Sequence, residues 1–107
     1  MREFESRLVN VRKEFIESVR GAGKIKCAYV GLYGAGVIHS LECNYTQAQY
    51  DKFLEALDFE YEAELFEDKL FGTIWYTDGR WSNRQEWRGF GYWTLHIPPN
   101  IPPQLKG

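Results

Sequence analysis

Residues 70–97, LFGTIWYTDGRWSNRQEWRGFGYWTLHI, decide the fold that this chain can adopt. The segment contains all four tryptophans of the protein and three of its arginines. Asp78-Gly79 stands between two aromatic runs and is the signal for a two-residue type I′ turn, because both central positions of that turn need a positive φ. A looser second turn follows at Gly89-Phe90-Gly91. The segment therefore predicts a three-stranded antiparallel meander.

The Asp78-Gly79 turn predicts the register of the first two strands. Tyr76 then faces Trp81 across the hairpin, and side chains alternate between the two faces with period two. One face is apolar and carries Leu70, Ile74, Tyr76, Trp81 and Trp87. The other face carries Phe71, Thr73, Trp75, Thr77, Arg80, Ser82, Arg84, Glu86 and Arg88.

The length of the second turn decides which side chains of the last strand lie on the apolar face. A one-residue slip exchanges the faces of a whole strand, so burial favours a three-residue turn that places Trp93 and Leu95 on the apolar face. This register predicts an outward binding surface, in which aromatic side chains lie among cationic ones. The predicted binding residues are Trp75, Arg80, Arg84, Arg88, Tyr92 and His96.

The first half of the chain predicts two helices and two strands. Apolar residues at three- and four-residue steps indicate an amphipathic helix over residues 2–20, ended by Gly21-Ala22-Gly23. Strands are expected at Lys24–Tyr33, in the interior of the sheet, and at Val37–Glu42. A second helix, capped by Asn44 or Thr46, extends to about Leu57 with Tyr50, Phe53, Leu54 and Leu57 as its buried side.

The remaining segments complete the predicted order. Residues 58–69 read as a short edge strand or an extended connection, and the Pro-rich tail 98–107 is expected to run extended along the surface. The order is α-β-β-α-(β)-β-β-β over one domain, residues 1–107. It predicts an α+β fold, an antiparallel sheet of about five strands with both helices on one face. The other face is then open to solvent, to a partner or to the folded-back tail.

The charge distribution and the cysteine content limit the classes of function that this chain can have. The net charge of −2 conceals an acidic block at residues 51–68, which holds eight acidic groups against Lys52 alone. This balance does not favour non-specific nucleic-acid binding. Cys27 and Cys43 are too few for a disulfide scaffold and read as buried thiols. With no export signal and no membrane-spanning run, a cytoplasmic location is expected.

No motif indicates catalysis, a cofactor or a metal. The soft metal ligands Cys27, Cys43, His39 and His96 form none of the close pairs that structural zinc sites use. The glycines of residues 31–36 precede a strand and offer no helix N-terminus to a phosphate. An enzymatic or small-molecule-binding role stays open, but the sequence assembles no pocket for it.

The outward face of the meander is the strongest functional feature. Trp, Tyr and Arg dominate the hot spots of protein interfaces, so we expect a non-enzymatic protein that binds a protein partner there. The acidic residues Asp58, Glu60, Glu62 and Glu64 are expected to add an electrostatic contact to a basic partner. An alternative is stacking of single-stranded nucleic acid on the same face. Purely internal arginine–aromatic pairing and homodimer formation are also open interpretations.

One pattern resembles a known group of proteins. It is Gly72-Thr-Ile-Trp75-x-x-Asp78-Gly79-x-Trp81-x-x-Arg84-x-Glu86, followed by Tyr92-Trp93 and the Pro-rich tail. It resembles the C-terminal part of small, mostly uncharacterised proteins of phages, prophages and other mobile elements, over about residues 70–103 and more weakly over Tyr29 to Phe59. The turn at Arg88-Gly-Phe-Gly departs from the acidic turn of those proteins. The resemblance implies a small accessory protein of a mobile element and supplies no active site.

Overall fold

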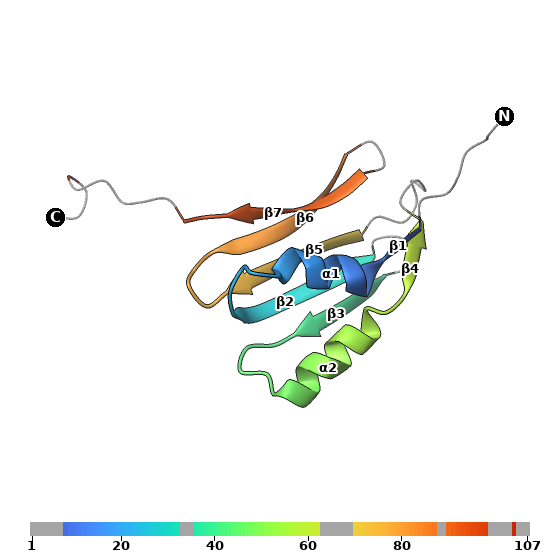
Figure 1. The fold of residues 1–107 in the computed structure, drawn as a ribbon, viewed down its shortest axis with the longest axis horizontal. Helices are drawn as coiled ribbons and strands as arrows, with labels where there is room; N and C mark the ends of the chain where they lie inside the picture. The colour runs from blue at the N-terminus through green and yellow to red at the C-terminus, as the bar shows by residue number, and fades with distance from the viewer. Residues whose placement is uncertain (1–7, 33–35, 63–69, 88–89, 99–103, 105–107) are drawn as a thin grey trace.

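Nine elements follow one another along the chain, in a computed structural model that describes residues 8–32, 36–62, 70–87, 90–98 and 104 (Figure 1). Only the backbone is described for residues 61, 62, 86, 87 and 90. The elements are β1 (Leu8–Asn10), α1 (Val11–Val19), β2 (Ile25–Leu32), β3 (Val37–Leu41), α2 (Gln47–Ala56), β4 (Glu60–Glu62), β5 (Leu70–Tyr76), β6 (Trp81–Trp87) and β7 (Phe90–His96).

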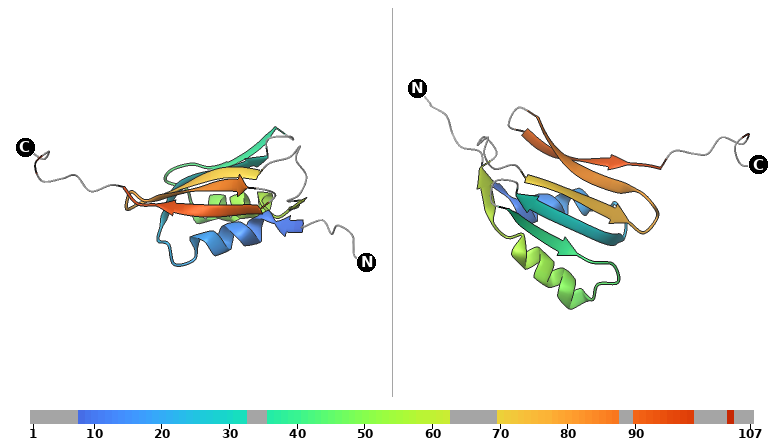
Figure 2. Two further views of the ribbon diagram at one scale, coloured as in Figure 1. Left: turned by 90° about the horizontal axis from the view of Figure 1, so that it is seen from above. Right: turned by 180° about the vertical axis from the view of Figure 1, so that it is seen from behind.

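The strands form one large and one small sheet. The large sheet is antiparallel and has the order β3-β2-β5-β6-β7, while β1 and β4 pair with each other. Figure 2 shows α1 against one face of the large sheet and the opposite face without a described helix. The predicted α+β class and the interior position of β2 are confirmed. Within the described residues, no helix has the length and apolar character needed to cross a membrane.

Both helices begin at a capping residue. The side chain of Asn10 accepts a hydrogen bond of 2.9 Å from the Lys13 amide, which starts α1 at Val11. The helix predicted over 2–20 was therefore too long, because residues 8–10 pair with β4; residues 1–7 lie outside the described part. In α2, Thr46 and Gln49 form a reciprocal capping box, so of the two predicted caps, Asn44 and Thr46, the structure uses Thr46.

The turn between β5 and β6 corrects the predicted register. Trp75 lies opposite Trp81, the Tyr76 amide donates to the Arg80 carbonyl at 2.9 Å, and Gly79 has a φ of 96°. The turn thus holds the three residues 77–79, whereas two were predicted. The Asp78 carboxylate accepts a hydrogen bond of 3.1 Å from the Arg80 amide, which favours the longer turn. As a result, the described side chains of β6, residues 81–85, lie on the face opposite to the predicted one.

The second turn also differs from its predicted length. Trp87 lies opposite Phe90, so the turn has two residues and not three. The two errors cancel for β7: Trp93 shares the helix-covered face with Ile74, and Tyr92 shares the open face with Trp75. They do not cancel for β6, whose Ser82 and Arg84 are buried while Trp81 is 37% exposed.

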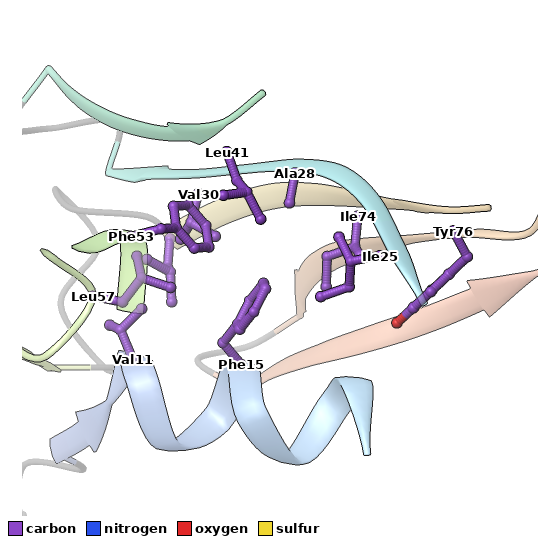
Figure 3. Packing of buried hydrophobic residues seen from close by; sticks show 11 residues of the cluster. Val11, Phe15, Ile25, Ala28, Val30, Leu41, Phe53, Leu57, Ile74 and Tyr76 are labelled. Atoms are coloured by element: carbon purple, nitrogen blue, oxygen red, sulfur yellow. The ribbon is translucent and has the colours of Figure 1, made fainter. Parts of the chain in front are cut away.

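The core lies between the helices and the covered face of the sheet (Figure 3). Phe15 of α1 points from the helix toward the sheet and meets Phe53 and Trp93 edge to face, at ring-centroid distances of 5.4 and 6.1 Å. Trp93 crosses the sheet above Gly72, where a Cβ would lie 2.9 Å from the indole and 2.6 Å from the Tyr29 carbonyl oxygen. The glycine therefore makes the packing of this indole feasible.

Candidate functional site

The open face of the sheet carries side chains in parallel rows across the strands. In one row, Trp75 stands between Cys27 and Trp81, and Trp81 stands beside His96. The next row is polar and consists of Ser40, Tyr29, Thr73, Asn83 and Thr94. Beyond it lie Ile38 and Phe71 on one side of the sheet and Gln85 opposite Tyr92 on the other. We call these residues together the aromatic face.

Large apolar side chains of this face are accessible. The exposed fraction is 40% for Trp75, 37% for Trp81, 48% for Tyr92 and 61% for Ile38. A contiguous patch of exposed aromatic side chains is uncommon on a protein that has no partner. The aromatic face is therefore the best candidate for a functional surface among the described residues.

Neighbouring side chains hold the aromatic rings in place. Trp81 stacks on His96 at a centroid distance of 4.1 Å, and a ring nitrogen of His96 lies 2.6 Å from the Asn83 side-chain oxygen. Tyr29 contacts Trp75 and Phe71 at 5.9 and 6.0 Å between ring centroids. The Thr73 hydroxyl donates to the Tyr29 hydroxyl at 3.1 Å. These rings would lose little side-chain entropy on binding, because they are already ordered.

Arg80 and Arg84 do not belong to this face, contrary to the sequence prediction. Arg84 is 5% exposed on the helix-covered face, where its Nε and Nη2 donate to the Glu14 carboxylate at 2.5 and 3.2 Å. Arg80 is half-buried at the end of the sheet and donates to the Ala22 carbonyl and to Asp78. Arg88 lies outside the described residues. Among the regularly paired residues of the aromatic face, none carries a Lys, Arg, Asp or Glu side chain.

The predicted acidic contact lies elsewhere. Asp58 is exposed next to α1, accepts a hydrogen bond of 3.2 Å from Asn10 and lies 3.7 Å from Arg12. Glu60 is exposed in β4, opposite Asn10 in the small sheet. The backbone of Glu62 continues this strand, and Glu64 lies outside the described residues. The structure therefore does not bring the described acidic residues together with the aromatic face.

The two thiols are neighbours, and one differs from the prediction. Cys27 is half-buried, but Cys43 is exposed, so the expectation of two buried thiols was wrong for Cys43. Burial, and next the hydrogen bond with Cys43, raise the pKa of the Cys27 thiol. A raised pKa disfavours the thiolate, the nucleophilic form of cysteine. In the described part of the chain, no three His, Cys, Asp or Glu side chains lie grouped as metal ligands.

Sequence analysis predicted three residues of this face correctly. Trp75, Tyr92 and His96 were predicted on the outward surface, and the structure places all three there. Trp81 was assigned to the core, because the turn was taken one residue too short. One signal pointed to the true register: Glu14 lies on the apolar stripe of α1 between Val11 and Phe15, and a half-buried carboxylate favours a cationic partner such as Arg84.

Comparison with protein-family models, curated proteins and solved structures gave no match to this chain.

Proposed function

We propose that this protein is a non-enzymatic binding module that holds a protein partner on its aromatic face. The observation that carries the proposal is the row formed by Trp75, Trp81 and His96, with two exposed indoles side by side on a sheet face that no described helix covers. Tryptophan and tyrosine supply large rigid contact areas, which is why they dominate interface hot spots. The polar row beside them offers hydrogen bonds that would orient the partner.

The setting of this activity is part of the proposal. We infer from the resemblance of residues 70–103 that the protein serves a phage or another mobile element as an accessory protein. A cytoplasmic partner, from the host or from the element, fits that role.

The aromatic face favours protein over nucleic acid. Single-strand binding proteins combine stacking side chains with a cationic groove for the phosphates. Here the stacking groups are present, but Arg84 is turned to the opposite face and paired with Glu14. Binding without phosphate neutralisation depends little on salt, whereas nucleic-acid binding weakens steeply as salt rises.

The test is capture of the partner by immobilised protein, from host and infected-cell lysates with and without nuclease, followed by titration with the purified partner. The variant Trp75→Ala/Trp81→Ala removes the two indoles and should weaken binding by at least about a hundredfold. The matched control is Leu95→Ala, since Leu95 is 44% exposed but lies on the opposite face of the sheet.

The result that supports the proposal is a protein partner whose affinity falls for the double variant, holds for Leu95→Ala, and changes little between about 50 and about 200 mM salt. Equal affinity of the double variant and the native protein would contradict the assignment of the face. Capture of nucleic acid alone, lost on nuclease treatment, would replace it with the single-strand alternative.

A further inference from the structure

A groove runs between β3 and α2, at the edge of the sheet that lies farthest from the meander (Figure 1). It has a volume of about 480 Å³, which is within the usual range of ligand-binding sites. Residues 38–44 line it from β3 and the following turn. From α2, Gln49, Lys52, Phe53 and Ala56 line it at steps of three and four residues, so they form one stripe of the helix.

The strand wall of this groove is a free sheet edge. β3 is the end strand of the sheet and pairs only with β2 among the described strands. In an antiparallel pair, alternate residues direct their N–H and C=O groups away from the neighbour, so β3 presents such groups toward the groove side. Its side chains leave the edge accessible, as Ile38 is 61% exposed and Ser40 is exposed.

The chemistry of the groove selects an extended peptide. Unpaired backbone groups along the five residues of β3 match a strand of roughly 17 Å. Leu41 and Phe53 are buried at the base of the groove, and Gln49, Lys52 and Glu42 are exposed at its rim. A peptide strand would thus pair with β3 and turn alternate side chains toward the apolar base.

A single strand fits this edge better than a second whole sheet. The edge of a second copy of β3 carries its own α2, and pairing the two edges would bring both helices toward the same space. A peptide with no helix beside it avoids that conflict. We infer that the groove between β3 and α2 binds an extended peptide segment by strand addition to β3, with an apolar side chain of the peptide directed at Phe53 and Ala56.

This site shares Ile38 and Ser40 with the aromatic face but contains none of Trp75, Trp81 and His96, so its test does not depend on the proposed function. The probe is a displayed library of random heptapeptides, selected on the immobilised full chain, followed by synthesis of an enriched peptide. Two readouts report strand addition. Backbone N-methylation of the peptide should abolish binding at alternate positions only, because only every second N–H meets β3. Amide NMR signals of Ile38–Leu41 and of the facing side of α2 should shift on titration.

Two protein variants test the location of the site. Ala56→Phe places a ring in the groove and should weaken peptide binding by at least about tenfold. Glu55→Phe, at the adjacent exposed position that does not line the groove, should change affinity by less than about twofold. The variant Trp75→Ala/Trp81→Ala should leave peptide binding intact.

Four results of the peptide experiments would overturn the inference. They are the absence of any enriched peptide, full binding by Ala56→Phe, N-methylation effects without alternation, and amide shifts confined to β5, β6 and β7. A dimer in light scattering that Ala56→Phe dissociates would assign the edge to a second copy of the chain and overturn the peptide assignment.

Discussion

Glu14 of α1 and Arg84 of β6, far apart in the chain, form a bidentate ion pair beneath the sheet. Arg84 also donates to the Leu70 carbonyl at 3.1 Å, and the Trp93 indole N–H donates to Glu14 at 2.9 Å. One carboxylate therefore joins α1 to both β6 and β7. Gly91 makes room for this arrangement, because a Cβ there would overlap the Arg84 guanidinium.

The first prediction concerns this pair. Glu14→Gln leaves the buried guanidinium without its counter-charge and should lower the free energy of unfolding by about 3 kcal/mol. Arg84→Met should also destabilise, and the double variant should lose clearly less than the sum. Urea denaturation measures all three. Glu17→Gln, at an exposed position of the same helix, is the control, and additive losses would show that the pair is not coupled.

The register of β6 predicts different costs for two tryptophans. Trp81→Ala should lower the free energy of unfolding by only about 1 kcal/mol, since its ring lies on the open face against His96. Trp93→Ala should cost roughly 3 kcal/mol or more, because its ring packs on Phe15 and its N–H bonds Glu14. Thermal and urea unfolding of the two variants decide the question. A larger loss of stability for Trp81→Ala than for Trp93→Ala would contradict this register and support the two-residue turn.

The first hairpin turn depends on Gly79. Its φ of 96° lies in the region that side chains with a Cβ rarely adopt, so Gly79→Ala should cost about 1–2 kcal/mol. Thr77→Ala in the same turn removes an exposed side chain and should cost less than about 0.5 kcal/mol. Chemical denaturation of both variants provides the comparison. Equal stability of the two would mean that the turn does not need the left-handed conformation.

The Tyr76 hydroxyl is buried without a hydrogen-bond partner in the described part of the chain. Removing it in Tyr76→Phe should leave the protein unchanged or stabilise it by up to about 1 kcal/mol, since the hydroxyl, although near Ser82, lacks a well-formed hydrogen bond. Burial raises the pKa of Tyr76 above its ordinary value of 10.0. Stability linked to this group is then fully present below pH 10 and is lost as the pH rises through the raised pKa.

Alkaline unfolding tests this second consequence. Tyr76→Phe should lose less stability above pH 10 than the native protein does, and Tyr45 and Tyr50, whose pKa values burial also raises, should account for part of the remaining loss. A hydroxyl that stabilises the fold would instead make Tyr76→Phe less stable at neutral pH.

Local sequence signals predicted the elements well and their relative register poorly. Thr46, one of two candidate caps, marked the start of α2, and the aromatic runs around Asp78-Gly79 marked the two strands of the hairpin. The turn length could not be read from Asp-Gly alone, because the same dipeptide serves two-residue turns and three-residue turns with glycine last. The choice depends on tertiary partners such as Glu14 for Arg84.

The error in turn length also affected which residues were predicted for the candidate site. Trp75 was found because it lies on β5, before either turn, and Tyr92 and His96 were found because two one-residue errors cancelled for β7. Arg84 and Trp81 of β6 exchanged faces. The groove beside β3 left no sequence signal, since it arises where α2 packs along the edge strand. β3 is an edge strand because it comes last in the sheet order, and no short sequence motif encodes that order.

The sheet order also bears on how the chain reaches its native state. β2 with β3 and β5 with β6 and β7 are each joined by short turns, so both units can form from neighbouring residues. Among the described strands, the two units meet only where β2 pairs with β5. This junction pairs Ile25 with Tyr76 and Leu32 with Leu70, and the α2 segment lies between the two strands in the sequence. Forming this junction closes the long loop of chain between β2 and β5. The loss of chain entropy on loop closure is offset only once β2 and β5 have paired. Folding speed should therefore respond to residues of the β2–β5 junction, and much less to either turn.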